Sequence, residues 1–287
     1  MGFFYSLKLK NKINLYIYFS NSQTMKSLIL AILTLVSIQL TAQTSEEAEK
    51  AALAKATQNP VAAMYSLPFQ NNTTFGNAPF NRSQNVLNIQ PVIPVQLTKD
   101  INLINRVILP VITQPSPILD ESSTGTGDTN YSAWLSPAKA GKIIYGIGPA
   151  MQLPTASSNN FGSGEFGIGP SLVALTIIDK WVAGIVTNNI WTFGDVSENK
   201  FLFQYFVNYN LPKAWYLVSG PIITANWNAT SGQTWTVPFG GGFGKVFKIG
   251  KRPVNFNAHI YHNTVRPDGY GEWSTRFQLQ FLFPVKK

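Results

Sequence analysis

The stretch GSGEFG, residues 162–167, has the G-x-G-x-x-G spacing of a dinucleotide-binding loop. In such a loop the glycines let the backbone approach a pyrophosphate, and an acidic residue about 20 positions further on binds the ribose. Asp179 follows at nearly that spacing. However, a loop-forming sequence, TASSNNF, precedes the glycines, and an alternating strand pattern follows them. No helix would begin at the glycines to face a phosphate, so we predict a loop-to-strand junction here.

A second glycine-rich stretch, FGGGFGK at 239–245, invites comparison with a phosphate-binding P-loop. The first glycine that the P-loop requires is Phe239 here, and Val246 stands where the Mg²⁺-binding Ser or Thr belongs. The alternation instead indicates a strand that carries glycines on one face and aromatic residues on the other. We therefore expect no nucleotide and no other cofactor at this stretch.

Histidine also does much of the chemistry in enzymes, and the chain contains only His259 and His262. Side chains at i and i+3 on a strand point to opposite faces, so these two rings cannot bind one metal ion together. The sequence has neither an H-E-x-x-H nor a G-x-S-x-G motif. We therefore expect no catalytic residue and no metal site.

The charges are few and scattered. Charged residues make up 12% of the chain, and the formal net charge is +9. Four lysines lie in the first 42 residues, where no acidic residue occurs. The other basic residues form no basic helix or stripe of the kind that nucleic-acid-binding proteins carry, so we expect no nucleic-acid partner. Cysteine is absent, which excludes disulfides and thiolate metal sites.

The N-terminal region has the layout of an export signal. From Met25 the chain reads MKSLILAILTLVSIQLTAQ, with one lysine, an apolar stretch and the small residues Thr41 and Ala42 before Gln43. The apolar stretch is too short to span a bilayer as a helix, which needs about 20 residues. We expect a signal peptide over 25–42 that is cleaved near Ala42, and an upstream mis-start over 1–24.

The rest of the chain has one helical stretch and then a period of two. A helix is predicted over 43–60, where TSEEAEKAALAKATQN has acids in its first turn and Pro60 at its end. From 61 to 287, apolar and polar residues alternate. In WSTRFQLQFLF, 273–283, every second residue from the Trp onward is apolar or Thr. We predict strands near 62–70, 85–96, 101–113, 128–137, 142–154, 164–177, 180–192, 199–210, 214–228, 233–248, 252–264 and 271–283.

The predicted connections alternate in length. Loops such as TASSNNFGS and VRPDGYG alternate with short turns that hold Lys99, Lys139 or Lys213. An even number of strands, short turns at one end and longer loops at the other are typical of outer-membrane barrels. We predict an all-β fold, a transmembrane antiparallel up-and-down β-barrel of about 12 strands with a short N-terminal helix, in the outer-membrane bilayer of a Gram-negative bacterium.

Aromatic residues fit the two interfaces of a bilayer. Trp215 and Trp227 lie twelve residues apart on one face of one predicted strand. At about 3.3 Å per residue and with a tilted strand, this separation is roughly 30 Å of height, which suits aromatic girdles at both interfaces. We predict Trp215, Trp227, Trp235 and Trp273 as membrane-interface aromatics.

Four prolines inside predicted strands disfavour a regular closed barrel. Pro149, Pro170, Pro221 and Pro238 fall inside predicted strands. A closed barrel has no free edge, so each proline deletes a hydrogen bond of the ladder. We expect bulges or shifted strand boundaries at these positions.

The polar faces of the predicted strands should line the lumen. The candidate lumen-lining residues are Gln204, Asn208, Asn210, Asn255, Asn257, His259, Tyr261, Arg276, Gln278 and Gln280. The candidate small lumen-facing residues are Gly146, Gly148, Gly167, Gly169, Gly240, Gly242 and Gly244. Most of the polar candidates are neutral amides, which predicts little charge selectivity.

Several stretches resemble a known family. They are YGIGPAMQLPTA, GSGEFGIGPS, FVNYNLP, WTVPFGGGFGKVFKIGKRPVNFNAHIYHN and RFQLQFLFP. The likeness covers residues 58–284 and is to a family of bacterial outer-membrane transporters named for the MetA pathway of phenol degradation, often labelled neuromedin U. The resemblance implies a β-barrel and a transport role, and it supplies no catalytic residues. Barrels commonly end on an aromatic residue that the outer-membrane assembly machinery recognises, whereas Phe283 here is followed by PVKK.

Three hypotheses about function follow. The first is an outer-membrane transporter or channel for small solutes, with hydrophobic or aromatic solutes suggested by the family name. The second is a closed structural barrel that presents surface loops and whose lumen is plugged, with the N-terminal helix either filling the lumen or lying in the periplasm. The third is an outer-membrane barrel enzyme with His259 as a base, and we prefer the first.

Overall fold

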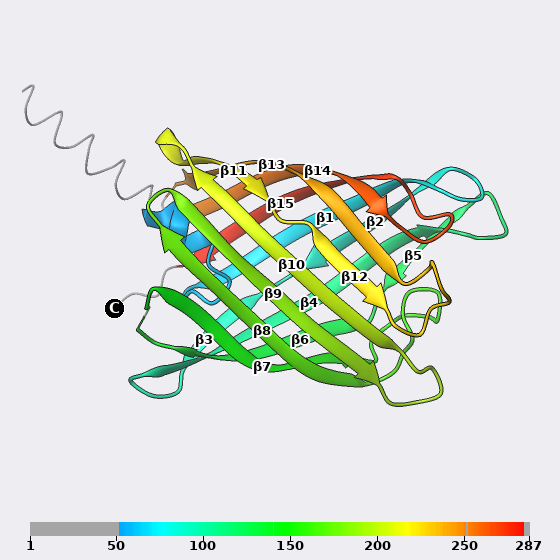
Figure 1. Cartoon of the computed structure of the whole chain (residues 1–287), viewed down its shortest axis with the longest axis horizontal. Coiled ribbons are helices and arrows are strands. Elements are labelled where there is room, and N and C mark those ends of the chain that lie inside the picture. The colour runs from blue at the N-terminus through cyan, green and yellow to red at the C-terminus, as the bar shows by residue number, and fades with distance from the viewer. Residues whose placement is uncertain (1–51, 140, 251, 284–287) are drawn as a thin grey trace, which may run out of the picture. The chain divides into compact units, whose positions relative to one another are not determined.

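Residues 52–139, 141–250 and 252–283 are described by a computed structural model of the chain. They form an antiparallel sheet that closes on itself as a barrel (Figure 1). The predictions of an upstream mis-start over 1–24, a signal peptide over 25–42 with cleavage near Ala42, and the first part of the helix over 43–60 lie outside the described residues. Within the described ranges, no helix is both long enough and apolar enough to cross a membrane.

The sheet contains fifteen strand segments, and one short 3-10 turn, η1, joins two of them. The segments are β1 (Tyr65–Asn77), β2 (Arg82–Ile89), β3 (Val92–Gln96), β4 (Ile101–Pro115), β5 (Ser122–Thr126), β6 (Thr129–Pro137), β7 (Ile143–Leu153), β8 (Gly167–Ile178), β9 (Trp181–Thr192), β10 (Asn199–Asn210), η1 (Pro212–Ala214), β11 (Trp215–Ser219), β12 (Ile222–Asn226), β13 (Trp235–Ile249), β14 (Arg252–Val265) and β15 (Trp273–Phe283).

These segments occupy twelve positions around the wall. β2 and β3 follow one another between β1 and β4, β5 and β6 both pair with β4, and β11 and β12 both lie between β10 and β13. β15 pairs with β1, from Tyr65 opposite Phe283 to Phe75 opposite Trp273, and closes the ring. The prediction of a twelve-stranded antiparallel up-and-down barrel is confirmed.

The four prolines interrupt the ladder as expected. Pro149 and Pro170 stand opposite each other on β7 and β8. The pairing is lost on the other side of each strand: the β6–β7 register skips Ala133 and Trp134, and the β8–β9 register has a gap at Gly169 and Pro170. Pro221 separates β11 from β12, and the register of β13 against β14 shifts at Pro238.

The first strand begins later and ends further along than predicted. β1 runs to Asn77, beyond the strand predicted near 62–70, although its second half, NNTTFGN, is polar. The amides of Asn71 and Asn85 bond each other across β1 and β2 at 3.0 and 2.9 Å, and Asn85 also donates to Thr73 Oγ1 at 2.8 Å. Polar side chains that satisfy one another in this way continue the sheet.

The connections differ between the two ends of the barrel. One end, which we call the turn end, carries short turns such as 97–100, 179–180 and 211–214. The other, which we call the loop end, carries longer connections such as 154–166 and 227–234. The first strand starts and the last strand ends at the turn end, where Tyr65 pairs with Phe283.

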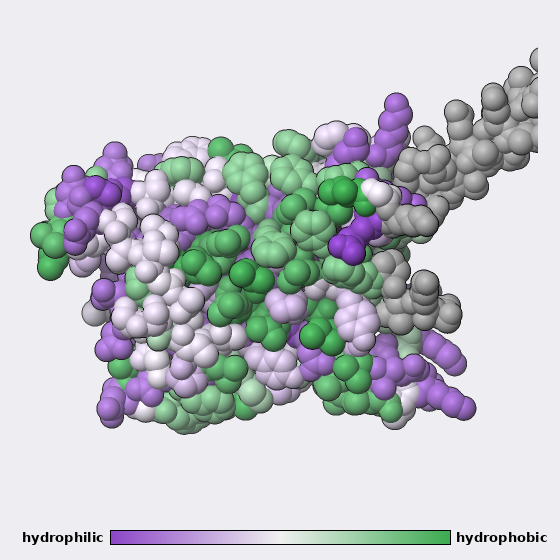
Figure 2. All heavy atoms as spheres, turned by 180° about the vertical axis from the view of Figure 1, so that it is seen from behind, coloured by the Kyte–Doolittle hydropathy of each residue, from purple (hydrophilic) through white to green (hydrophobic). Residues whose placement is uncertain are grey.

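The outer wall is apolar. Figure 2 shows hydrophobic side chains gathered over the middle of one face and hydrophilic ones toward both ends. The exposed large apolar side chains include Ile143, Ile147, Ile178, Leu217, Phe239, Phe243, Ile260 and Phe277. Water would penalise so large an apolar surface, whereas the hydrocarbon of a bilayer would stabilise it.

Part of the barrel interior is filled by an apolar cluster on one side. Val61, from the segment that precedes β1, packs against Ile104, Trp134, Val173 and other side chains of β4, β6, β8, β9 and β10. Trp134 is 1% exposed, and its indole nitrogen donates to Ser171 Oγ at 2.9 Å. The opposite side of the interior, on β14, β15 and β1, is polar.

Candidate functional site

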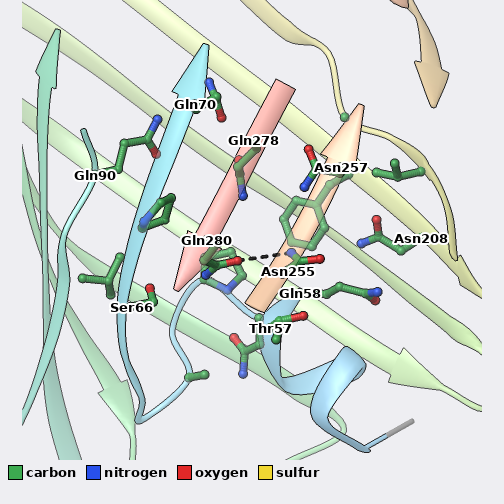
Figure 3. A pocket seen from close by; sticks show the side chains of 18 of the residues that line it. Thr57, Gln58, Ser66, Gln70, Gln90, Asn208, Asn255, Asn257, Gln278 and Gln280 are labelled. Atoms are coloured by element: carbon green, nitrogen blue, oxygen red, sulfur yellow. Dashed lines mark hydrogen bonds between the residues drawn. The ribbon is translucent and has the colours of Figure 1, made fainter. Parts of the chain in front are cut away.

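A cavity of about 180 Å³ lies inside the barrel. Its wall is formed by inward-facing side chains of β10, β11, β14, β15, β1 and their neighbours, and the segment 56–64 forms its floor toward the turn end. Figure 3 shows amide side chains from β1, β14 and β15 pointing into one space, with Thr57 and Gln58 beside it. The period of two places these side chains together, since alternate residues of adjacent strands share the inner face.

A chain of hydrogen bonds organises the polar wall. Tyr216 on β11 donates its hydroxyl to Asn255 Oδ1 at 2.8 Å and accepts from Asn257 Nδ2 at 3.4 Å. Asn255 Nδ2 in turn donates to Gln280 Oε1 on β15 at 3.2 Å. These bonds hold the amides in fixed orientations along the inner face of β14.

His259 continues this chain toward the loop end. Its Nε2 lies 2.8 Å from Asn257 Oδ1, and its Nδ1 lies 2.8 Å from the hydroxyl of Tyr261. Both ring nitrogens therefore have neutral partners, and neither faces a carboxylate or a nucleophilic hydroxyl of Ser or Thr. His262 lies on the other face of β14, where its Nε2 is 2.8 Å from Glu272 Oε1.

Arg276 extends across the polar side of the lumen. It stands opposite His259 in the β14–β15 register and is 7% exposed. Its Nε donates to Asn72 Oδ1 at 2.9 Å, and its Nη1 donates to the carbonyl oxygen of Gly220 at 2.8 Å. The guanidinium carbon lies 5.2 Å from the centre of the Tyr261 ring, a cation–π contact.

Arg106 is a cavity residue that was not among those predicted from the sequence. It lies on the inner face of β4 and lines the same cavity as Arg276. Its Nη2 donates to Gln90 Oε1 at 2.7 Å. The signal was present in INLINRVILP, where Arg106 has the same parity as the buried Asn102 and Ile104.

The segment before β1 closes the cavity at the turn end. Residues 52–57 form a helical turn, and Ala54 in it is buried against Ala214, Tyr216 and Val246. Two hydrogen bonds of 3.0 and 3.2 Å join the amides of Gln58 and Asn210. We call residues 52–64 the plug segment, because they lie between the cavity and the turn end.

The predicted lumen residues fall into two groups. Those that line the cavity are Gln204, Asn208, Asn255, Asn257, His259, Arg276, Gln278 and Gln280. Asn210 bonds to Gln58 of the plug segment and also donates to the carbonyl oxygen of Lys180 in the turn before β9. Tyr261 contacts His259 and Arg276 on the side of the loop end.

Two of the predicted small residues make room for bulky side chains in the lumen. A Cβ at Gly244 would overlap the ring of Tyr216, and one at Gly146 would come within 2.9 Å of Trp134 Cβ. Gly148, Gly169, Gly240 and Gly242 instead face backbone carbonyls of the neighbouring strands closely, and Gly167 faces Ile190 and Trp191.

The predicted interface tryptophans lie at the two ends of the outer wall. Trp215 begins β11 near the turn end, beside Phe243 at 6.0 Å between ring centres, and Lys245 lies over its ring. At the loop end Trp227 and Trp235 pack together at 5.2 Å, and Trp273 packs on His262 at 4.9 Å. Two further exposed tryptophans, Trp181 and Trp191, lie near the ends of β9.

The GSGEFG stretch connects two loops at the loop end, the one before β8 and the one before β10. We call the hydrogen bonds that join Ser163 and Glu165 to residues 195–198 the clasp. Asp128 Oδ2 accepts from the amide of Gly164 at 3.1 Å, and Ser163 Oγ donates to Glu198 Oε2 at 2.9 Å. Glu165 Oε1 accepts from the amides of Asp195 and Val196 at 3.0 and 3.3 Å. The stretch is thus the loop-to-strand junction that the sequence predicted.

The pKa of Glu198 reflects this clasp. Burial alone would raise it, but hydrogen bonds from Lys200, Gln152 and Ser163 outweigh burial and lower the pKa below its ordinary value. Gln152 Nε2 donates to Glu198 Oε2 at 3.0 Å, and Lys200 Nζ lies 2.5 Å from Glu198 Oε1.

Within the described ranges, no three His, Cys, Asp or Glu residues are grouped as metal ligands would be.

Comparisons with known proteins support the architecture. No protein family model and no curated protein sequence matches the chain. The fold is similar to that of an outer membrane channel from Pseudomonas putida F1, with 17% sequence identity, coverage of 77% of this chain and 94% of the channel, and a TM-score of 0.58. A FadL homologue from Pseudomonas aeruginosa has 10% identity and a TM-score of 0.44, with coverage of 79% and 93%.

Outer membrane phospholipase A from Escherichia coli has 11% identity and a TM-score of 0.39, with coverage of 78% and 99%. The likeness to this enzyme and to the FadL homologue is too low to support an argument about this chain. The Pseudomonas putida channel establishes the fold alone. The resemblance to the MetA-pathway family stays a prediction, and the described residues form a barrel of the outer-membrane type.

Proposed function

We propose that the chain is an outer-membrane channel for small solutes, whose path runs through the barrel lumen and is restricted at the turn end by the plug segment. The observation that carries the proposal is the polar cavity that lies inside an apolar outer wall. A barrel that only anchors surface loops needs no polar cavity, because an apolar core would fill its interior more stably.

The contacts of the plug segment support a closure that can be released. Val61 and Ala54 pack in apolar clusters, and Gln58, which follows the helical turn, forms an amide pair with Asn210 of the wall. Neutral amide hydrogen bonds contribute about 1 kcal/mol each. Small modifications of the segment should therefore change the open fraction without unfolding the barrel.

The outer-membrane location, contact with the lipid bilayer and insertion by the outer-membrane assembly machinery belong to the same proposal. The apolar wall, the aromatic residues at both of its ends and the similar fold of a channel from the outer membrane support them. No feature of His259 favours an enzyme, since both of its ring nitrogens bind neutral side chains.

Liposome swelling tests the proposal. Purified protein in liposomes should admit small neutral sugars, and a variant that lacks residues 43–58 should admit them several times faster. This deletion leaves Val61 and its cluster in place, and heat-modifiable gel mobility reports whether the barrel has folded. Folded protein that stays impermeable in both forms would contradict the proposal.

A further inference from the structure

Two guanidinium groups face the one cavity from different parts of the wall. Arg106 lies on β4 and Arg276 lies on β15, and both line the space above the plug segment. Their positions are fixed, because Gln90 holds the first while Asn72 and Gly220 hold the second. The cavity therefore contains two oriented positive charges.

Among the described residues, neither guanidinium has an acidic partner. The acceptors are the amide oxygens of Gln90 and Asn72 and the carbonyl oxygen of Gly220, all of them neutral. Among the residues that line the cavity there is no Asp and no Glu. A buried charge without an opposite charge is costly, and a bound anion would remove that cost.

Donors remain available for such an anion. Within the described ranges, Nε and Nη1 of Arg106 and Nη2 of Arg276 form no hydrogen bond to the protein. No buried side-chain nitrogen or oxygen of these ranges lacks a partner, so these three nitrogens are accessible to solvent, and both arginines line the cavity. A planar guanidinium matches the geometry of a carboxylate, which it can bind through two parallel N–H groups.

We propose that the cavity is a binding site for small organic carboxylates, held between Arg106 and Arg276. The apolar side chains of Val92, Val186 and Phe206 also line the cavity, and they would contact the hydrocarbon part of such a carboxylate. This inference rests on the proposed channel for its role in transport. It also replaces the prediction of little charge selectivity, which considered the amides and omitted Arg106.

Binding can be measured without any transport. Benzoate and its neutral counterpart benzamide are titrated into the full protein in detergent by calorimetry. We expect benzoate to bind and benzamide to bind at least about tenfold more weakly, because charged hydrogen bonds are roughly twice as strong as neutral ones. The substitution Arg106→Gln should weaken benzoate binding about tenfold. Arg252→Gln is the matched control, since Arg252 lies over Phe283 outside the cavity lining.

Arg276→Gln should also weaken benzoate binding. If this variant does not fold, Arg106→Gln decides alone, because Arg106 has one hydrogen bond to lose. Equal binding of benzoate and benzamide, or benzoate binding that Arg106→Gln leaves unchanged, would overturn the inference.

A second measurement separates this inference from the proposed function. The reversal potential in a KCl gradient should show anion preference, and Arg106→Gln should reduce it. Conductance that prefers cations, or a preference that ignores the substitution, would overturn the anion site and leave the channel intact. Benzoate binding in a protein that never conducts would overturn the channel and support the anion site.

Discussion

The guanidinium of Arg276 donates a 2.8 Å hydrogen bond to the carbonyl oxygen of Gly220, although β13 and β14 separate their strands in the wall. The side chain crosses the inner face of both strands above the ring of Tyr261. On β13, Gly240, which pairs with Tyr261, and Gly242 lie so close to backbone carbonyls of β14 that a Cβ would collide with them. Gly244 of the same strand instead leaves the space that the ring of Tyr216 fills in the lumen.

The packing of Gly244 against Tyr216 gives a first prediction. A methyl group at 244 would overlap the tyrosine ring, so Gly244→Ala should destabilise the barrel by about 1–3 kcal/mol. The same substitution in a Tyr216→Leu background should cost much less, because the smaller side chain leaves room. Urea unfolding of the two single variants and the double variant measures the coupling. Additive costs would show that the glycine has another role.

A second prediction concerns the apolar side of the lumen. Trp134 is 1% exposed and bonded to Ser171, so Trp134→Ala should cost about 3–5 kcal/mol. Trp181 lies on the outer wall and is 50% exposed, so Trp181→Ala serves as the control and should cost clearly less. Unfolding by urea in lipid vesicles compares them. Equal costs would contradict the assignment of Trp134 to the packed interior.

The clasp at the loop end should loosen in acid. The pKa of Glu198 is lower in the folded protein than its ordinary value of 4.5. Its contribution to stability is therefore complete above about pH 4.5 and is lost as the pH falls through the lower folded pKa. Amide hydrogen exchange of the segment 155–166, expressed as protection over an unfolded peptide, should fall in this window.

Glu198→Gln is the control for that measurement. The glutamine cannot ionise, so it should give weaker protection of 155–166 near neutral pH and little further change in acid. Protection that falls equally in both proteins would assign the effect to another group.

Much of the fold was predictable from the sequence, because a period of two needs only local information. The twelve strands, the prolines at irregular positions and the separation of His259 from His262 follow from it. Long-range placement was harder. Nothing in the local sequence shows that Gln58 reaches Asn210, which is 152 residues away. The sequence therefore left open whether the N-terminal helix fills the lumen or lies in the periplasm. Arg106 was missed because its strand reads as mainly apolar.

The central claim is that solutes pass through the lumen, and cysteine labelling tests it most directly. The chain has no cysteine, so Gln278→Cys introduces one thiol into the cavity lining, and Phe277→Cys places one on the outer wall of the same strand. Each variant is labelled in detergent with a charged methanethiosulfonate, checked by mass spectrometry and reconstituted, with and without residues 43–58. We expect the label at 278 to lower single-channel conductance and the label at 277 to leave it unchanged. Equal conductance of the two labelled proteins would contradict a path through the lumen.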